Sequence, residues 1–220
     1  MATSTVEDYL KQILLEEQAS PGRRVSTGQV AAALKVAPGT ATAMIKTLAD
    51  SGLLAYEPYS GVSLTGSGRQ LALHVLRRHR LVELFLVRVM GMDWSEVHTE
   101  AEELEHAISD RLLARMDEVL GHPSVDPHGD PIPDAQGVVA EIGGISLAAC
   151  ELGRSVRITR VTDQSPEFLR LLERRNLMPG SLLAVTGRDE ASDTVDLALA
   201  DGSLIALGWR AASKILVGDG

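Results

Sequence analysis

Cysteine is almost absent from this chain, because Cys150 is the single cysteine among 220 residues. One thiol excludes a disulfide within the chain and a zinc site built from several cysteines, and nothing in the sequence assigns Cys150 a role. Aromatic residues make up only 3%, so the cores must consist of aliphatic side chains. No stretch is apolar enough to cross a membrane, and the first residues, MATSTVEDYL, lack the pattern of a secretory signal. We therefore expect a cytoplasmic protein with no membrane partner.

Positive charge is also scarce, and the net charge of −9 argues against a nucleic-acid partner. The distribution of charge weakens that argument. Residues 1–70 contain six basic and six acidic side chains, so this segment is neutral and the acidic excess lies further along the chain. The length allows two or three small domains, which can differ in their partners.

The first 70 residues have the order of elements of a winged helix-turn-helix. Ser4 and Glu7 have the spacing of a capping box, which predicts a helix from Ser4 to about Ala19. A second helix is capped by Ser26 or Thr27, and Pro38 suits the first position of a third. Two short strands follow, at 53–56 and 62–65.

The third helix of such a module enters the DNA major groove with its N-terminal residues leading. Threonine hydroxyls and a lysine on its exposed face suit contacts to phosphates or bases, and the tip of the wing can reach the backbone. The alternatives are a packing module for protein partners, or polar residues that are merely solvated. The predicted DNA-binding residues are Thr40, Thr42, Lys46, Tyr59 and Ser60.

Two long helices are predicted next, at about 65–90 and 94–120. Both are rich in aliphatic residues, so each can bury one face on the other and still expose apolar surface. That surplus favours a homodimer, which would also present two DNA-binding heads to a palindromic operator.

Four side chains of ligand type, His98, Glu102, Glu105 and His106, fall within an arc of about 100° if they lie on one helix. The preceding helix offers His79 and Glu83 at positions i and i+4. Imidazole together with carboxylate oxygen suits Mn²⁺, Fe²⁺, Co²⁺, Ni²⁺ or Zn²⁺.

The alternative for this cluster is a solvated acidic face, since Glu100, Glu102, Glu103 and Glu105 form a run of charge. A solvated face has no need of imidazoles, which favours the metal site. The remaining histidines, His74, His122 and His128, do not share the pattern and are interpreted as ordinary surface or loop residues.

Several stretches of the chain resemble the iron- and manganese-dependent repressors, the family that includes the diphtheria toxin repressor and the manganese transport regulator. They are VEDYL at 6–10, YExYxGVxLTxxG at 56–68, RHRLxE at 78–83, VHxEAxxLEHxIS at 97–109 and PHGDPIP at 127–133. The resemblance covers the whole chain.

The resemblance implies two metal sites in each subunit. The primary site would use Asp8, Glu102, Glu105 and His106. The ancillary site would use His79, Glu83 and His98, completed from the C-terminal domain by Gln164 and Glu167. The last pair is Glu then Gln in the iron-responsive members, so its order is reversed here.

Iron-responsive members of the family have Met and Cys where this chain has Asp8 and Glu102. Replacing sulfur by oxygen suits Mn²⁺, so manganese is the expected effector. Short manganese-responsive members have a Glu at the position of Lys11, and a charged lysine cannot bind a metal, which keeps Fe²⁺ open as an alternative effector. Asp8 also has another interpretation, because an acid in the first turn stabilises a helix through its dipole.

The sequence of the C-terminal segment predicts a small β-barrel. Strands are predicted at 156–161, 182–187, 195–199, 204–207 and 215–217, with a short helix at 167–176. Longer members of the family end in an SH3-like domain, which this pattern matches.

The sequence therefore predicts a mainly α-helical protein with a small β domain. Its three domains are a winged helix-turn-helix at 1–70, a metal-binding and dimerisation domain at 71–140 and an SH3-like barrel at 141–220. The expected function is a metal-dependent transcriptional regulator, not an enzyme, that represses metal-uptake genes. Two alternatives are a winged-helix regulator that senses an organic ligand and a metalloenzyme that uses the His/Glu cluster.

Overall fold

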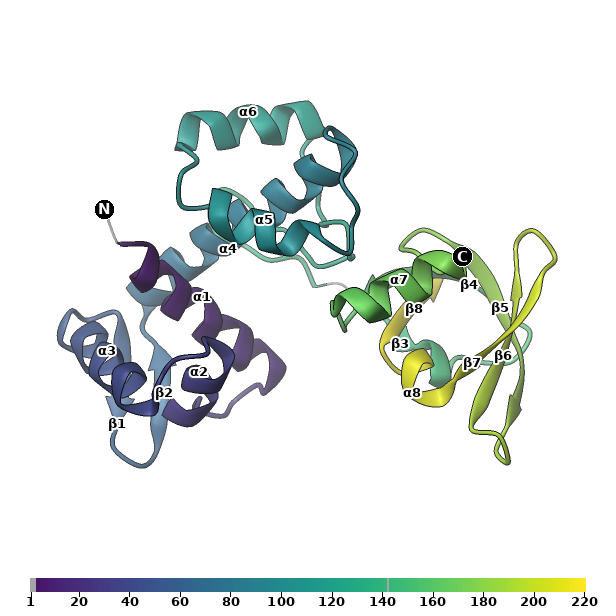
Figure 1. Cartoon of the computed structure of the whole chain (residues 1–220), viewed down its shortest axis with the longest axis horizontal. Coiled ribbons are helices and arrows are strands. Elements are labelled where there is room, and N and C mark those ends of the chain that lie inside the picture. The colour runs from purple at the N-terminus through teal and green to yellow at the C-terminus, as the bar shows by residue number, and fades with distance from the viewer. Residues whose placement is uncertain (1–2, 142) are drawn as a thin grey trace. The chain divides into compact units, whose positions relative to one another are not determined.

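The computed structural model describes residues 3–141 and 143–220. The chain forms two compact units, which are described separately. The first contains the residues up to 79 together with 133–138, and the second contains 80–132 with 139–220 (Figure 1). Within the described ranges, no helix combines the length and hydropathy needed to cross a membrane.

The first unit is a winged helix-turn-helix, as predicted. Three helices are followed by an antiparallel hairpin, in which Leu54 pairs with Leu64 and Glu57 with Gly61. The elements are α1 (Ser4–Ala19), α2 (Thr27–Ala33), α3 (Pro38–Asp50), β1 (Leu54–Glu57), β2 (Gly61–Leu64) and the beginning of α4 (Gly66–Arg88).

The core of this unit is aliphatic. Leu10, Ile13 and Leu14 of α1 pack with Ile45 and Leu48 of α3, and each is at most 2% exposed. Burying a side chain of this size stabilises the fold by roughly 1.5–3 kcal/mol. These residues therefore stabilise the packing of α1 against α3.

Side chains cap the starts of α2 and α4, whereas the capping box predicted for α1 does not form. Ser26 forms the capping box of α2 with Gln29, and the Thr65 hydroxyl accepts a hydrogen bond from the Gly68 N–H at 3.1 Å at the start of α4. The capping box predicted for Ser4 is wrong, because Thr3 is the N-cap and its side chain makes no cap hydrogen bond. Glu7 is engaged elsewhere, since its carboxylate pairs with the Arg78 guanidinium at 2.8 Å.

The helix predicted at 94–120 is in fact two helices, α5 (Val97–Leu104) and α6 (Asp110–Leu120). Ser109 is the N-cap of α6, and its hydroxyl accepts a hydrogen bond from the Leu112 N–H. Serine favours this position because its side chain satisfies an amide that has no partner in the helix. The five residues between the two helices therefore leave the helical path.

The C-terminal part of the second unit is a small β domain, as predicted. Its sheet has the strand order β3-β8-β4-β5-β6-β7, and neighbouring strands are antiparallel. The strands are β3 (Ile145–Ser146), β4 (Ser155–Val161), β5 (Leu182–Asp189), β6 (Thr194–Leu199), β7 (Leu204–Gly208) and β8 (Ile215–Asp219). The helical elements are η1 (Leu147–Ala149), α7 (Pro166–Arg174) and α8 (Trp209–Ala212).

Alternating residues of these strands face one core, which includes Val156, Ile158, Val185 and Val195. Trp94, from the segment before α5, is buried in the same core. The β domain is therefore tied to the segment that leads into α5.

Candidate metal centre and DNA-binding surface

Helix α4 positions two ligand-type residues one turn apart. His79 and Glu83 occupy positions i and i+4 and are 5% and 1% exposed. His98, near the start of α5, has its Nδ1 at 3.2 Å from Glu83 Oε1, and its side chain is 56% exposed. The arrangement joins a buried carboxylate to an imidazole that solvent can reach.

The second set of predicted ligands lies at the end of α5 and just beyond it. Glu102 is on α5, with its Oε1 at 3.7 Å from His98 Nε2. Glu105 caps the helix and His106 follows it, so the prediction that all four residues lie on one helix is wrong. They nevertheless stay together, because Glu105 Oε1 is 3.4 Å from His106 Nε2.

The donor set of these residues fits a divalent cation. Glu105 is fully buried, and a buried carboxylate is stable only when it is paired, hydrogen-bonded or bound to a metal. The donors that surround it are oxygen and nitrogen atoms, the ligand types that Mn²⁺, Fe²⁺ and Zn²⁺ accept. The residues present are thus suited to hold such an ion.

Asp8 belongs to the first unit, on α1, and is half-buried. The ion pair between Glu7 and Arg78 links α1 to α4 next to it. Lys11, one turn further along α1, is only 5% exposed. Ligation by Asp8 together with Glu102, Glu105 and His106 remains a prediction.

The two ligands expected from the C-terminal domain lie in different surroundings. The Gln164 amide donates a hydrogen bond from Nε2 to Asp130 Oδ2 at 2.6 Å. Glu167, in the first turn of α7, is exposed. The role of both as ancillary ligands stays a prediction.

The segment from Val125 to Pro131 buries polar residues that the sequence reasoning missed. Asp126, His128 and Asp130 are 4%, 0% and 6% exposed. His128 lies in a turn, as predicted for a loop histidine, but it is buried and not on the surface. Proline and glycine in this stretch, which we call the linker segment, are typical of an exposed loop and hid this burial. The alternation of Asp, His and Asp around Gly129 was the available signal.

The surroundings of Asp126 strongly affect the pKa of its carboxyl group. Burial raises the pKa of Asp126 well above its ordinary value, and the carboxylates of Asp130 and Glu83 raise it further. The Arg80 guanidinium and the backbone N–H of Asp130 oppose this rise. Like charges therefore crowd around one buried carboxyl.

The predicted DNA-binding residues lie on the surface of the first unit. Thr40 and Lys46 are exposed on α3, whereas Thr42 is half-buried and donates its hydroxyl hydrogen to the Pro38 carbonyl at 2.8 Å. Tyr59 is fully exposed at the tip of the hairpin, with a φ of 67°, and Ser60 beside it is exposed. Thr42 thus has less capacity for DNA than its two neighbours on α3.

Three family models match consecutive parts of the chain. The N-terminal DNA binding domain of the iron dependent repressors matches residues 1–62, their metal binding and dimerisation domain matches 65–134, and a FeoA domain matches 145–218. The chain is also similar to the iron-dependent repressor IdeR of Mycobacterium tuberculosis, with 33% identity over 189 residues, 85% of this chain and 79% of that protein. The chain belongs to the iron-dependent repressor family.

Two further relatives support membership in this family. The diphtheria toxin repressor of Corynebacterium diphtheriae is 32% identical over 198 residues, 84% of this chain and 85% of the relative. A solved structure of a manganese-dependent transcriptional repressor in complex with manganese superposes with a TM-score of 0.86 at 42% identity, covering 98% of this chain and 100% of the other.

Membership in the iron-dependent repressor family confirms the predicted class. The protein is a metal-dependent transcriptional regulator with a DNA-binding domain and a metal-binding and dimerisation domain. Its relatives are transcriptional repressors and not enzymes, which confirms the prediction on enzymatic activity. Helix α6 exposes Leu112 and Val119, at 48% and 53%, within the region that matches the dimerisation domain.

Proposed function

We propose that this protein is a manganese-responsive repressor that acts in the cytoplasm as a homodimer on a palindromic operator and represses metal-uptake genes. The primary metal site uses Asp8, Glu102, Glu105 and His106. The ancillary site uses His79, Glu83 and His98, with Gln164 and Glu167 from the β domain.

The observation that carries this proposal is the fully buried Glu105 carboxylate next to the His106 imidazole. With Glu102 and Asp8, the primary set offers oxygen and nitrogen donors and no sulfur. Mn²⁺ binds such hard donors, whereas thiolate and thioether ligands favour softer ions. The chemistry of the donor set therefore supports manganese over iron as the effector.

The proposed mechanism is linkage between metal and DNA. Asp8 is on the first helix of the DNA-binding head, whereas the other primary ligands belong to the second unit. A metal that binds both would fix the head relative to the dimer core, so that two heads match two half-sites. DNA must then raise the metal affinity by the same factor by which the metal raises the DNA affinity.

Fe²⁺ is the second candidate effector, and Lys11 is the reason. The buried side chain of Lys11 lies on the same helix as Asp8. The resemblance to short manganese-responsive members implies a Glu ligand at this position. The manganese arrangement of those relatives therefore cannot form here unchanged.

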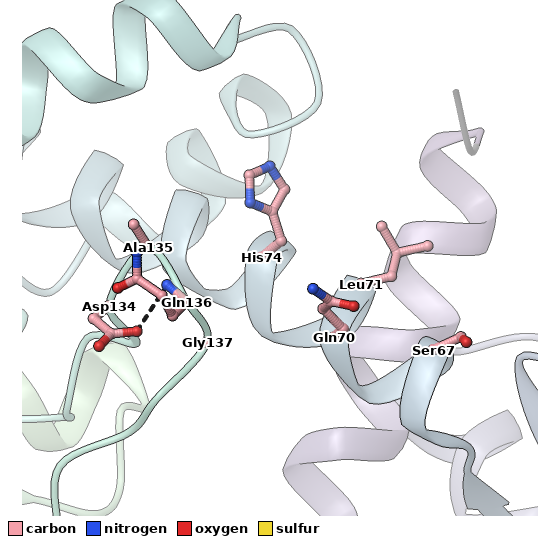
Figure 2. A pocket seen from close by; sticks show the side chains of 8 residues that line it. All are labelled: Ser67, Gln70, Leu71, His74, Asp134, Ala135, Gln136 and Gly137. Carbon is pink, nitrogen blue, oxygen red and sulfur yellow. Dashed lines mark hydrogen bonds between the residues drawn. The ribbon is translucent and has the colours of Figure 1, made fainter.

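A sensor for an organic ligand would need a dry, enclosed pocket. The first unit has a hollow of about 330 Å³ between the start of α4 and residues 134–137 (Figure 2). Gln70, His74, Asp134 and Gln136 line it, with the Gln136 N–H bonded to Asp134 Oδ1. Leu71 and Ala135 line it as well, so the hollow has a mixed lining and is not the dry pocket that such a ligand needs.

The test is DNA binding by fluorescence anisotropy, with the gene's own upstream region as the probe. Mn²⁺, anaerobic Fe²⁺, Zn²⁺ and a chelator are compared in parallel. We expect binding with Mn²⁺ and its loss with chelator. A preference for Fe²⁺ would reject the manganese assignment, and equal binding with and without metal would reject the linkage.

A matched pair of variants on α5 tests the site. Glu102→Ala removes a proposed ligand, whereas Glu103→Ala removes the exposed acid next to it. We expect only Glu102→Ala to abolish the response of DNA binding to Mn²⁺. If both variants respond like the unmodified protein, the assignment of the primary site is wrong.

A further inference from the structure

Two residues of the winged helix have a backbone conformation that their side chains disfavour. Among residues 3–141 and 143–220, those other than glycine with a positive φ are Lys35, Tyr59, His122, Asn176 and Asp193. Asparagine, aspartate and histidine are several-fold enriched in this left-handed region, whereas lysine and tyrosine are not. The two exceptions, Lys35 and Tyr59, both belong to the first unit.

Lys35 occupies a position that favours glycine. Its backbone N–H donates to the Ala32 carbonyl at 3.2 Å, and the Val36 N–H donates to the Ala31 carbonyl at 3.0 Å. These two bonds form the Schellman motif that ends α2, and the left-handed residue of this motif is usually glycine because it has no Cβ. Lys35 has a φ of 54°, so this helix end would be more stable with glycine.

The side chain of Lys35 does not repay this cost within the fold. It is exposed, and it makes no side-chain hydrogen bond or ion pair with the residues that the structure describes. A cation near the C-terminus of a helix interacts favourably with the helix dipole, but α2 has only seven residues and solvent screens an exposed charge. Backbone strain without a structural cause indicates a function.

Lys35 lies in the turn between the two helices of the helix-turn-helix. It is three positions before Pro38, the first residue of α3. In this motif the second helix, here α3, enters the major groove with its N-terminal residues leading, and the first helix, here α2, crosses the DNA backbone. The turn that joins them therefore lies at the edge of the groove. The long, flexible side chain of a lysine there can reach a phosphate oxygen.

The distribution of charge in the first unit also points to Lys35. Residues 1–70 contain six basic side chains, of which one is buried and two pair with glutamates. The three that are exposed and make no ion pair with any described residue are Arg23, Lys35 and Lys46. Lys35 precedes α3 and Lys46 lies within it. The recognition helix therefore has an unpaired cation before its start and another along its length.

Tyr59 is the second residue with this kind of strain. It is fully exposed at the tip of the hairpin, with a φ of 67°, and it is already among the residues predicted to contact DNA. Lys35 shares both properties, an unfavourable backbone conformation and an exposed side chain. The two strained positions of the first unit are thus the wing tip and the turn before the recognition helix.

We propose that Lys35 binds a phosphate of the DNA backbone and is a positioning residue for operator recognition. Its ammonium group holds the start of α3 at the edge of the major groove, at the expense of stability in the turn. A phosphate contact carries no information on base sequence, so Lys35 raises the affinity for specific and random DNA alike. The inference rests on the proposed function, because it extends the DNA-binding surface of the repressor.

The first test is Lys35→Gln, which removes the charge and keeps an unbranched side chain. DNA binding by the full chain with Mn²⁺ is measured by fluorescence anisotropy at several salt concentrations, on the gene's upstream region and on random DNA. For each DNA-binding head, we expect the affinity at 0.1 M salt to fall by about 8-fold and the slope of log affinity against log salt by about 1, on both DNAs. Lys35→Arg retains the charge and should retain the affinity.

Lys35→Gly separates a role in DNA binding from a role in the fold. Glycine relieves the strain of the left-handed position, so the midpoint of urea unfolding, followed by tyrosine fluorescence, should rise while the DNA affinity falls. Asn176→Gly is the matched control at a left-handed residue of the β domain, and it should leave the DNA affinity unchanged. A lower midpoint together with unchanged DNA affinity would show that Lys35 serves the fold, and the proposal would be wrong.

The unmodified protein distinguishes a failure of this inference from a failure of the proposed function. If it binds DNA only with metal, and Lys35→Gln binds with the same affinity and salt slope, the inference is overturned and the proposed function stands. If it binds equally with and without metal, the proposed function fails, and the same comparison on the metal-free protein still decides the role of Lys35. A loss of affinity on the upstream region alone would make Lys35 a reader of bases and would also overturn the phosphate contact.

Discussion

The core of the winged helix and the segment from Val125 to Pro131 are stabilised in opposite ways. The first buries aliphatic side chains such as Ile13 and Ile45, which need no particular partner. The second buries Asp126, His128 and Asp130, whose stability depends on hydrogen bonds, ion pairs or a cation. The free energy gained by burying apolar side chains is roughly proportional to the buried area and depends little on which groups are in contact. The free energy of a buried charge depends on each neighbouring charge and hydrogen bond.

This difference predicts that the stability of the two regions depends differently on metal. The winged-helix core should be insensitive to metal, and the linker segment should be sensitive to it. The two regions also have separate optical probes, because the three tyrosines all lie in the first unit and both tryptophans lie in the second. Four variants, in order of decreasing expected effect, can break or sharpen the comparison.

The largest effect is expected for Ile45→Ala in the winged-helix core. Ile45 is fully buried, so the substitution should lower the free energy of unfolding by about 2–5 kcal/mol, with and without metal. The tyrosine signal during urea unfolding measures it. Thr47→Ala, exposed on the same helix, should change stability by less than about 0.5 kcal/mol. A loss confined to the metal-free protein would contradict a purely apolar origin.

Asp8→Ala tests whether the head supplies a ligand to the metal. The affinity for DNA in the presence of Mn²⁺ should fall by about 5–150-fold, the usual range of coupling between two sites, while metal-free binding stays the same. Anisotropy titrations at fixed salt measure both affinities. Glu16→Ala, on the same helix, is the control, and an equal effect of both variants would show that Asp8 acts only through general charge.

Gly129→Ala should destabilise the linker segment more than Gly121→Ala. Both glycines have positive φ values, 87° and 75°, which a Cβ disfavours by about 1–2 kcal/mol. A Cβ at Gly129 would also collide with the Thr159 carbonyl, whereas Gly121 has nothing within 4 Å among the described residues. Tryptophan fluorescence, sensitive to the stacking of Trp94 on His128, reports the difference. An equal loss of stability in both variants would mean that the segment from Val125 to Pro131 can move to accommodate the Cβ at no free-energy cost.

The smallest effect is expected for Lys46→Ala on α3. An exposed lysine at a phosphate should weaken DNA binding similarly for all sequences and reduce the slope of log affinity against log salt by about 1. Titrations at several salt concentrations on specific and random DNA measure this slope. Arg111→Ala, an exposed cation on α6, should leave the slope unchanged. A change on the specific site alone would instead make Lys46 a reader of bases.

The sequence predicted most of the elements because their signals are local. The apolar stripe of α1, the serine cap of α2 and Pro38 at the start of α3 each depend on residues a few positions apart. The break between α5 and α6 was missed, although Ser109 and Asp110 were its signal. A continuous apolar pattern outweighed a single capping residue in that prediction.

The candidate site was only partly accessible to sequence reasoning. His79 and Glu83 could be chosen because they are one helical turn apart. His98 could be chosen because helix spacing places it in one arc with Glu102. The burial of His128 could not, because it depends on Trp94 and Val161, which lie more than 30 positions away on either side of it in the chain. Spacing along a helix carries no information about such contacts.

The amino-acid sequence by itself determined the winged helix, the strands of the β domain and the residues able to bind a metal, because capping, periodicity and ligand chemistry are properties of short segments. Only the tertiary structure decided that Glu105 is buried beside His106 and that Asp126 and His128 meet Glu83 in the interior. The degree of burial decides whether a carboxylate is solvated or needs a cation, and burial is set by distant parts of the chain packing together.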